Sequence, residues 1–146
     1  MISVNRILVP LDFDAKAEHV LDYARVIADA CGASLHLLHV TGYARGAEGV
    51  SPAGRHDACE RLKALLTDDD RHRRHATVSC VVGTPAFEIT NFAAANAIDL
   101  IVMGTHSHGP AFRMATGSIA DMVTGTAPCA VLTVKGAREG REPLVA

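Results

Sequence analysis

The chain has 146 residues, and its 14 Lys and Arg against 16 Asp and Glu give a formal net charge of −2. This length suits one domain that buries its own core without disulfide staples. The near-neutral charge, the absence of Trp and an aromatic content of 4% exclude the basic, stacking surface that nucleic-acid binding needs.

The cysteines stand singly among apolar neighbours, with no C-x-x-C pair. We therefore expect them to be small core residues in a reducing compartment. The four cysteines are Cys31, Cys59, Cys80 and Cys129.

No stretch approaches the roughly 18 apolar residues of a membrane helix, and the first residues leave no room for a signal peptide. We therefore expect a cytoplasmic protein that does not enter a membrane.

The first half of the chain predicts two strand–helix units. An apolar run at 7–9, followed by Pro10, is typical of a strand buried on both faces. Asp14 is the predicted N-cap of a helix that keeps one apolar stripe up to Cys31 and stops at Gly32. A second strand at 35–40 and a loop at 41–50 follow.

A second helix is predicted to start at Ser51 and Pro52, with an inward face that includes Cys59 and Leu62. The charged stretch 68–75 (DDDRHRRH) is interpreted as a solvated turn that carries both signs of charge.

The second half repeats the alternation. After a strand at 77–82, Pro85 begins a helix in which Phe87 and Ala97 are among the residues expected to face inward. The remaining expected elements are a strand at 100–103, a helix from 117 to about 124 ended by Gly125, a strand at 129–134 and an unstructured tail at 136–146.

Alternating strands and helices predict an α/β fold, in which a parallel sheet with right-handed crossovers carries helices on both faces. In such sheets ligands bind beyond the carboxyl ends of the strands, where the strand order reverses. Asp12, Val40 and Gly104 each stand at one of these ends.

The stretch 99–118 combines a strand that breaks at Gly104, a glycine-containing loop and a new helix at Gly117 and Ser118. The first turn of a helix presents unpaired N–H groups and the positive end of its dipole, so it stabilises a phosphate. The pattern therefore indicates an anion site.

Other phosphate and catalytic sites lack their motifs. There is no G-x-x-x-x-G-K-[ST], no G-x-G-x-x-G after the first strand, and no carboxylate at the end of the third. Ser118 has no G-x-S-x-G around it. Metal binding by His106 and His108, with His39 as a further ligand, stays open as an alternative.

Six short motifs stand in order along the chain. They are ILVPLD at 7–12, LHLLHV at 35–40, VGTP at 82–85, DLIVMGTH at 99–106, GS at 117–118 and APCAVLTV at 127–134. As a set they resemble the universal stress protein family over residues 6–134.

This resemblance implies a Rossmann-like adenine-nucleotide-binding domain, with a five-stranded parallel sheet of order 3-2-1-4-5, over residues 1–135. It also implies a homodimer formed through the fifth strand. The family's phosphate loop, G-x2-G-x9-G-[ST], is matched at Gly104, Gly117 and Ser118. Asp12 matches the ribose contact and Val40 the adenine contact. The implied binding residues are Pro10, Leu11, Asp12, Val40, Met103, Gly104, His106, Ser107, Gly109, Arg113, Gly117, Ser118 and Ile119.

Ser107 replaces the second glycine of the loop. If φ is positive there, its Cβ costs about 1–2 kcal/mol, and Gly109 is the residue that could absorb the strain. Three functions stay open. The first is an ATP-binding regulatory module, with or without Mg²⁺, whose protein partners the sequence does not identify. The second is a dimeric interaction protein without nucleotide, and the third is a slow ATPase that uses Asp12 to hold magnesium.

Overall fold

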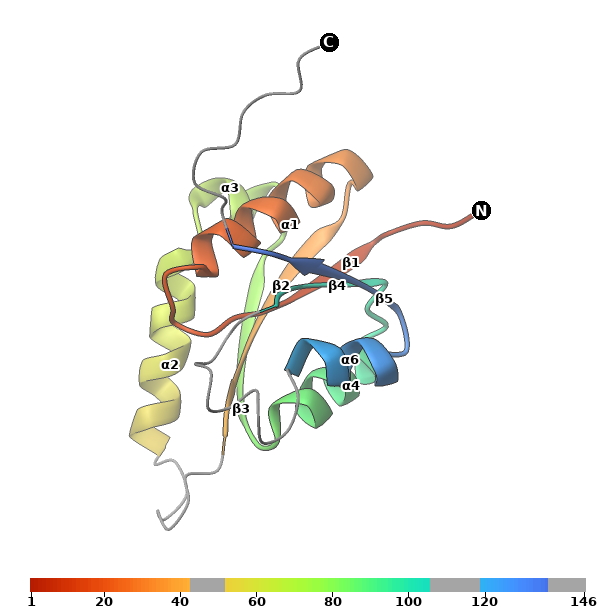
Figure 1. The fold of residues 1–146 in the computed structure, drawn as a ribbon. Helices are drawn as coiled ribbons and strands as arrows, with labels where there is room; N and C mark the ends of the chain where they lie inside the picture. The colour runs from red at the N-terminus through yellow and green to blue at the C-terminus, as the bar shows by residue number, and fades with distance from the viewer. Residues whose placement is uncertain (43–51, 106–118, 137–146) are drawn as a thin grey trace.

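The computed structural model describes residues 1–42, 52–105 and 119–136. Within them, the strands form one parallel sheet of order β3-β2-β1-β4-β5 with helices on both faces, as predicted (Figure 1). The elements in chain order are β1 Arg6–Pro10, α1 Ala17–Cys31, β2 Ser34–Thr41, α2 Pro52–Leu65, α3 Asp68–His72, β3 Thr77–Val82, α4 Pro85–Ala95, β4 Leu100–Gly104, α6 Ile119–Thr126 and β5 Ala130–Val134.

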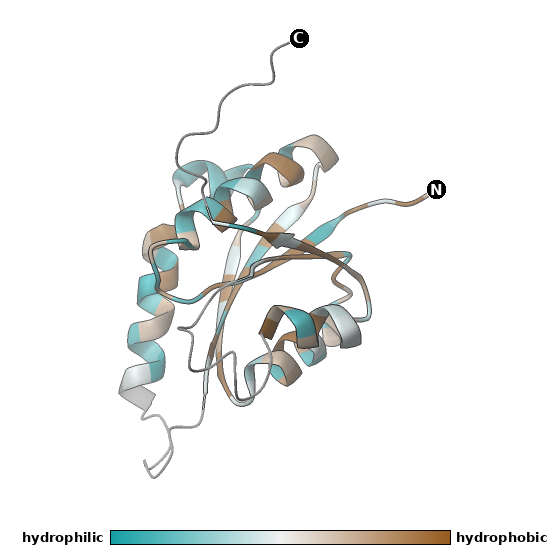
Figure 2. Ribbon diagram, in the orientation of Figure 1, coloured by the Kyte–Doolittle hydropathy of each residue, from teal (hydrophilic) through white to brown (hydrophobic). Residues whose placement is uncertain are grey.

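The sheet separates two apolar cores because successive strand residues point to opposite faces. In β1, Ile7 and Val9 join the core under α1 and α2, Leu8 joins the core under α4 and α6, and all three are fully buried. Figure 2 shows the same arrangement as apolar strands in the middle and more polar helix surfaces outside. The continuous apolar run at 7–9 is thus explained by burial on both sides.

The start of α1 differs from the prediction. Lys16, not Asp14, is the N-cap residue. Asp14 instead closes the preceding turn: its Oδ1 accepts the backbone N–H of Lys16 at 3.0 Å, and its carbonyl accepts that of Ala17 at 3.3 Å. The end of α1 is as predicted, since Gly32 has a φ of 67°, which glycine adopts without strain.

Most of the charged stretch after α2 is exposed, as expected, but it is not a turn. It forms α3, where the Thr67 side chain accepts the N–H of Asp70 and the Asp70 carboxylate accepts the N–H of Thr67, in a capping box. Asp70 is fully buried. The interpretation as a turn was wrong because it missed the charged side-chain partners of Asp70, one of which lies 45 residues away in the chain.

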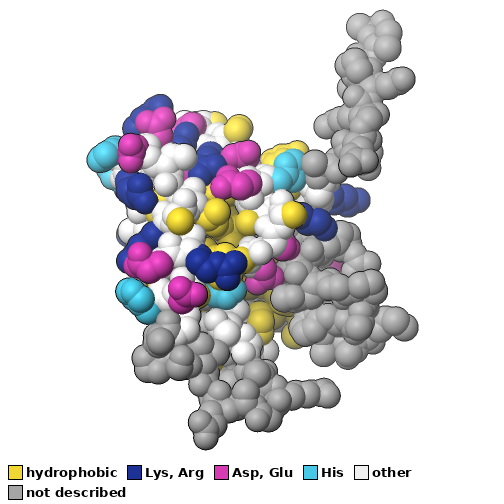
Figure 3. All heavy atoms as spheres, turned by 90° about the vertical axis from the view of Figure 1, so that its left-hand side faces the viewer, with side chains coloured by type: hydrophobic (Ala, Val, Ile, Leu, Met, Phe, Trp, Pro, Cys, Tyr) yellow, Lys and Arg dark blue, Asp and Glu magenta, His cyan; other side chains and the backbone are white. Residues whose placement is uncertain are grey.

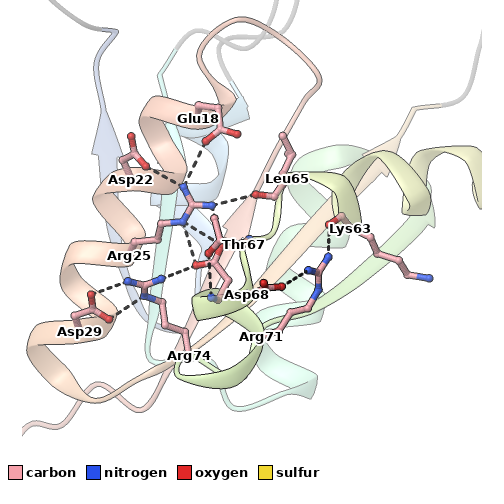
Figure 4. A network of polar contacts seen from close by, with 11 residues as sticks. Glu18, Asp22, Arg25, Asp29, Lys63, Leu65, Thr67, Asp68, Arg71 and Arg74 are labelled. Atoms are coloured by element: carbon pink, nitrogen blue, oxygen red, sulfur yellow. Dashed lines mark hydrogen bonds and ion pairs between the residues drawn. The ribbon is translucent and has the colours of Figure 1, made fainter.

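Those partners are two arginines (Figure 4). Arg25 of α1 donates from Nη2 to Asp70 Oδ2 at 2.7 Å, and Arg74 donates from Nη1 to Oδ1 at 2.8 Å. Arg74 also forms a two-pronged pair with Asp29, at 2.8 and 2.7 Å. The network therefore ties α1 to α3 through one buried carboxylate.

Burial alone would raise the pKa of the Asp70 carboxyl. Hydrogen bonds from Arg25, Thr67 and Arg74 outweigh this effect and hold the pKa at about 2.

Figure 3, which views the side of α2, shows acidic and basic side chains interspersed over this face. The charges of this face are thus mixed rather than gathered into a patch of one sign.

Four other expectations about burial and helix ends were wrong. Cys31 is exposed, as are the two residues before it. Phe87 is 61% exposed because the buried stripe of α4 runs through Ala86, Ile89 and Ala93. Ala97 lies beyond the end of α4, and α6 continues through Gly125 to Thr126.

No helix within residues 1–42, 52–105 and 119–136 is long and apolar enough to cross a membrane. The expectations for the loop after β2, for the loop 106–118 and for the tail concern residues 43–51, 106–118 and 137–146, which lie outside the described residues.

Replacing Asp70 with Asn should lower the free energy of unfolding by about 3–5 kcal/mol, because two arginines lose the buried carboxylate between them. Asp68→Asn is the matched control, since the Asp68 side chain is 91% exposed, and we expect less than about 0.5 kcal/mol there. Urea unfolding followed by circular dichroism measures both. Equal losses in the two variants would contradict the structural role of Asp70.

The stabilisation by Asp70 should depend on pH. Its folded-state pKa of about 2 lies below the ordinary value of 3.8, so the ionised carboxylate stabilises the fold above about pH 4 and the contribution disappears as the pH falls toward 2. The difference in unfolding free energy between the unaltered protein and Asp70→Asn should be constant between about pH 5 and 7 and shrink below about pH 4. Urea unfolding at stepped pH tests this; a constant difference down to about pH 2 would refute it.

Candidate functional site

A pocket opens at the carboxyl ends of β1, β2 and β4. After β1 the chain adds β2 and β3 on one side, whereas β4 and β5 lie on the other, so the strand order reverses between β1 and β4. Ligands of open α/β sheets bind at such a reversal because the loops diverge there and leave a crevice.

The pocket brings together every predicted binding residue that lies in the described part of the chain. These residues are Pro10, Leu11, Asp12, Val40, Met103, Gly104 and Ile119. The other predicted binding residues lie outside the described residues and are His106, Ser107, Gly109, Arg113, Gly117 and Ser118.

Further residues line the pocket that the sequence analysis did not assign to it. They come from the turn before α1, from α1 itself, from β2 and from the first turns of α4, and are Asp14, Lys16, Ala17, Val20, Leu38, Pro85 and Ile89. A usable signal was available for Pro85, because the predicted helix start there directly follows a strand end. Lys16 had no such signal, since a single lysine near a helix start is usually solvated.

Gly104 lies at the end of β4, on the side of α1. A Cβ at this position would lie 3.4 Å from Cγ2 of Val20, which also lines the pocket. A larger side chain at residue 104 would therefore occupy the space between β4 and α1. The glycine keeps this part of the pocket open.

His39 of β2 helps to position the segment that carries Asp12. Its Nδ1 lies 2.8 Å from the carbonyl oxygen of Leu11, and because a carbonyl only accepts, Nδ1 carries the hydrogen. The same nitrogen is 4.0 Å from Oδ1 of Asp12. The imidazole thus holds the backbone at Leu11 and lies within ion-pair distance of the Asp12 carboxylate.

Phe13 anchors the same segment on two other elements. Its ring centroid is 4.5 Å from that of His39, with a tilt of 34°. The guanidinium carbon of Arg61, on α2, lies 3.9 Å from the Phe13 centroid, in a cation–π contact. The segment that follows β1 is therefore packed against both β2 and α2.

Helix starts and a few charged groups set the electrostatics of the pocket. Its lining includes the first residues of α1, α4 and α6, which are Ala17, Pro85 and Ile119. The positive ends of these helices favour an anion. The charged side chains among the described lining residues are Asp12, Asp14 and Lys16.

Metal binding was the alternative for the histidines. Among the described residues, no three His, Cys, Asp or Glu side chains are grouped so that they could hold a metal ion. His106 and His108 lie outside those residues. The described part of the pocket offers apolar walls, the carboxylates of Asp12 and Asp14, the ammonium group of Lys16 and helix starts, a combination typical of a small-molecule site.

Comparison with known proteins agrees with this geometry. A model of the universal stress protein family matches residues 3–135. Universal stress protein MJ0531 of Methanocaldococcus jannaschii is 29% identical over 138 residues, which cover 89% of this chain and 81% of that protein.

Solved structures share the fold. Universal stress protein UspA from Lactobacillus plantarum is 28% identical with a TM-score of 0.64, and the match covers 92% of this chain and 99% of that one. A universal stress protein from Archaeoglobus fulgidus in complex with dAMP is 22% identical with a TM-score of 0.68, covering 92% of this chain and 100% of that one. The family motifs, the strand order and the match over residues 3–135 together show that this chain belongs to the universal stress protein family.

Proposed function

We propose that this universal stress protein binds an adenine nucleotide, ATP, in the pocket at the carboxyl ends of β1, β2 and β4. The observation that carries the proposal is the convergence of all seven described binding residues on one pocket, although they come from four separate parts of the chain. Independent structural roles would not require these positions to meet. The dAMP complex of the Archaeoglobus fulgidus relative supports the same class of ligand.

The chemistry of the walls suggests how the nucleotide lies. Val40, with Leu38 and Ile89 nearby in the lining, provides apolar surface for the adenine ring. Asp12 accepts hydrogen bonds from the ribose hydroxyls. The phosphates lie toward the start of α6 at Ile119, where unpaired N–H groups and the helix dipole favour negative charge.

We further propose that the domain of residues 1–135 acts in the cytoplasm as a regulatory binding module, and that Mg²⁺ accompanies ATP when phosphate charge must be neutralised. Among the described residues, no three His, Cys, Asp or Glu side chains are grouped to hold a metal ion. In this proposal the module acts by binding ATP, with hydrolysis slow at most.

We also propose a homodimer formed through β5. Among the strands of the described residues it pairs with β4 alone, so in this part of the chain its outer edge is a sheet edge at which another strand could pair. Leu132, on β5, is 37% exposed. An edge strand with an exposed apolar side chain is suited to pairing with a second copy.

Asp12→Ala should weaken ATP binding about 10- to 100-fold, because hydrogen bonds from ribose to a carboxylate are lost. Adenosine should lose at least as large a factor, since it contains the same ribose and carries no phosphate for the carboxylate to repel. Asp57→Ala, an exposed position of α2 that does not line the pocket, is the control and should bind ATP as the unaltered protein does. Titration calorimetry measures the affinities of the unaltered protein, Asp12→Ala and Asp57→Ala. Failure of the unaltered protein to bind ATP at millimolar concentration, with or without Mg²⁺, would refute the proposed function.

Leu132→Asp should convert the dimer into a monomer, because two carboxylates would face each other across paired β5 strands. The control is Val26→Asp on α1, where a 68% exposed apolar residue receives the same charge away from β5. Light scattering coupled to size exclusion at micromolar concentration gives the masses. A monomeric mass for the unaltered protein, or a dimer that persists in Leu132→Asp, would speak against pairing through β5.

A further inference from the structure

Lys16 is the described cation of the pocket, and its side chain has a defined position. The residue is half-buried at the N-cap of α1 and lines the pocket. A Cβ built on Gly136 would lie 3.4 Å from Lys16 Cε and 3.8 Å from Nζ. The lysine stem therefore packs over the backbone just after β5, and the ammonium group lies near the carboxyl ends of the strands.

The ammonium group has no counter-ion among the described residues. Within them, no hydrogen bond or ion pair involves Lys16 Nζ. Of the two acidic residues nearest in sequence, Asp14 uses its Oδ1 to accept the backbone N–H of Lys16, and Glu18 lies 3.4 Å from Nη1 of Arg25. A partly buried charge without a partner is unfavourable, so an anion that enters the pocket would compensate it.

The other charges of the pocket make this lysine important for a phosphate ligand. Asp12 and Asp14 are both acidic and both line the same pocket. Their carboxylates would repel phosphate, and the repulsion from the half-buried Asp12 is screened less by solvent than that from the exposed Asp14. An adenosine without phosphate would not experience that repulsion.

We propose that Lys16 selects phosphorylated over unphosphorylated ligands in this pocket, by pairing with the phosphate charge that Asp12 and Asp14 would otherwise repel. This inference rests on the proposed function, because it concerns the same adenine-nucleotide site. It assigns a discriminating role to α1, on the opposite wall of the pocket from the start of α6. Lys16 acts on affinity for the charged part of the ligand and not on the adenosine part.

The test compares adenosine, AMP and ATP by titration calorimetry at fixed ionic strength, in EDTA and again with Mg²⁺. Lys16→Gln keeps most of the stem and removes the charge. In EDTA it should weaken ATP binding about 10- to 100-fold, the range of a lost charge-assisted hydrogen bond, while adenosine affinity changes by less than about twofold. Lys16→Arg keeps the charge and should retain most of the preference for ATP over adenosine.

Lys63→Gln is the matched control, because Lys63 is an exposed lysine of α2 paired with Glu60 and does not line the pocket. It should leave all three affinities unchanged. An unaltered ratio of ATP to adenosine affinity in Lys16→Gln would overturn the inference and leave the proposed function standing. Absence of binding of all three compounds to the unaltered protein would overturn both.

Discussion

The structure depends on the burial of β1 between β2 and β4. This strand is paired on both edges and covered on both faces, so its side chains are buried whichever face they point to. Apolar residues are therefore favoured at consecutive positions, and Ile7, Leu8 and Val9 have no exposed area. Because β2 and β4 lie on opposite sides of β1, the strand order reverses between β1 and β4. The pocket lies at that reversal.

The loop after β1 is held by more contacts than its length suggests. His39 binds the carbonyl of Leu11, while Phe13 contacts both the His39 ring and the Arg61 guanidinium. Asp12 lies between these two anchored residues in sequence. A carboxylate in a fixed position loses less entropy on binding than a mobile one, so this packing prepares the pocket for a ligand.

Two charged groups illustrate opposite solutions to burial. Asp70 is enclosed by Arg25 and Arg74, and its charge is satisfied within the fold. Lys16 is half-buried in the pocket, and no described residue neutralises it. The first arrangement stabilises α1 against α3, whereas the second gives the pocket the lysine that we propose pairs with phosphate.

The amino-acid sequence by itself determined the alternation of strands and helices, the parallel sheet and the family, because buried strands and helix boundaries leave local patterns and Asp12, Val40 and Gly104 follow strand ends. It failed at 68–75, where the run of charges is polar in composition although Asp70 is buried. Only the tertiary structure decided that burial, since Arg25 is 45 residues away. It also decided that Lys16 lines the pocket and packs beside Gly136. No local sequence pattern records a contact between residues near opposite ends of the chain.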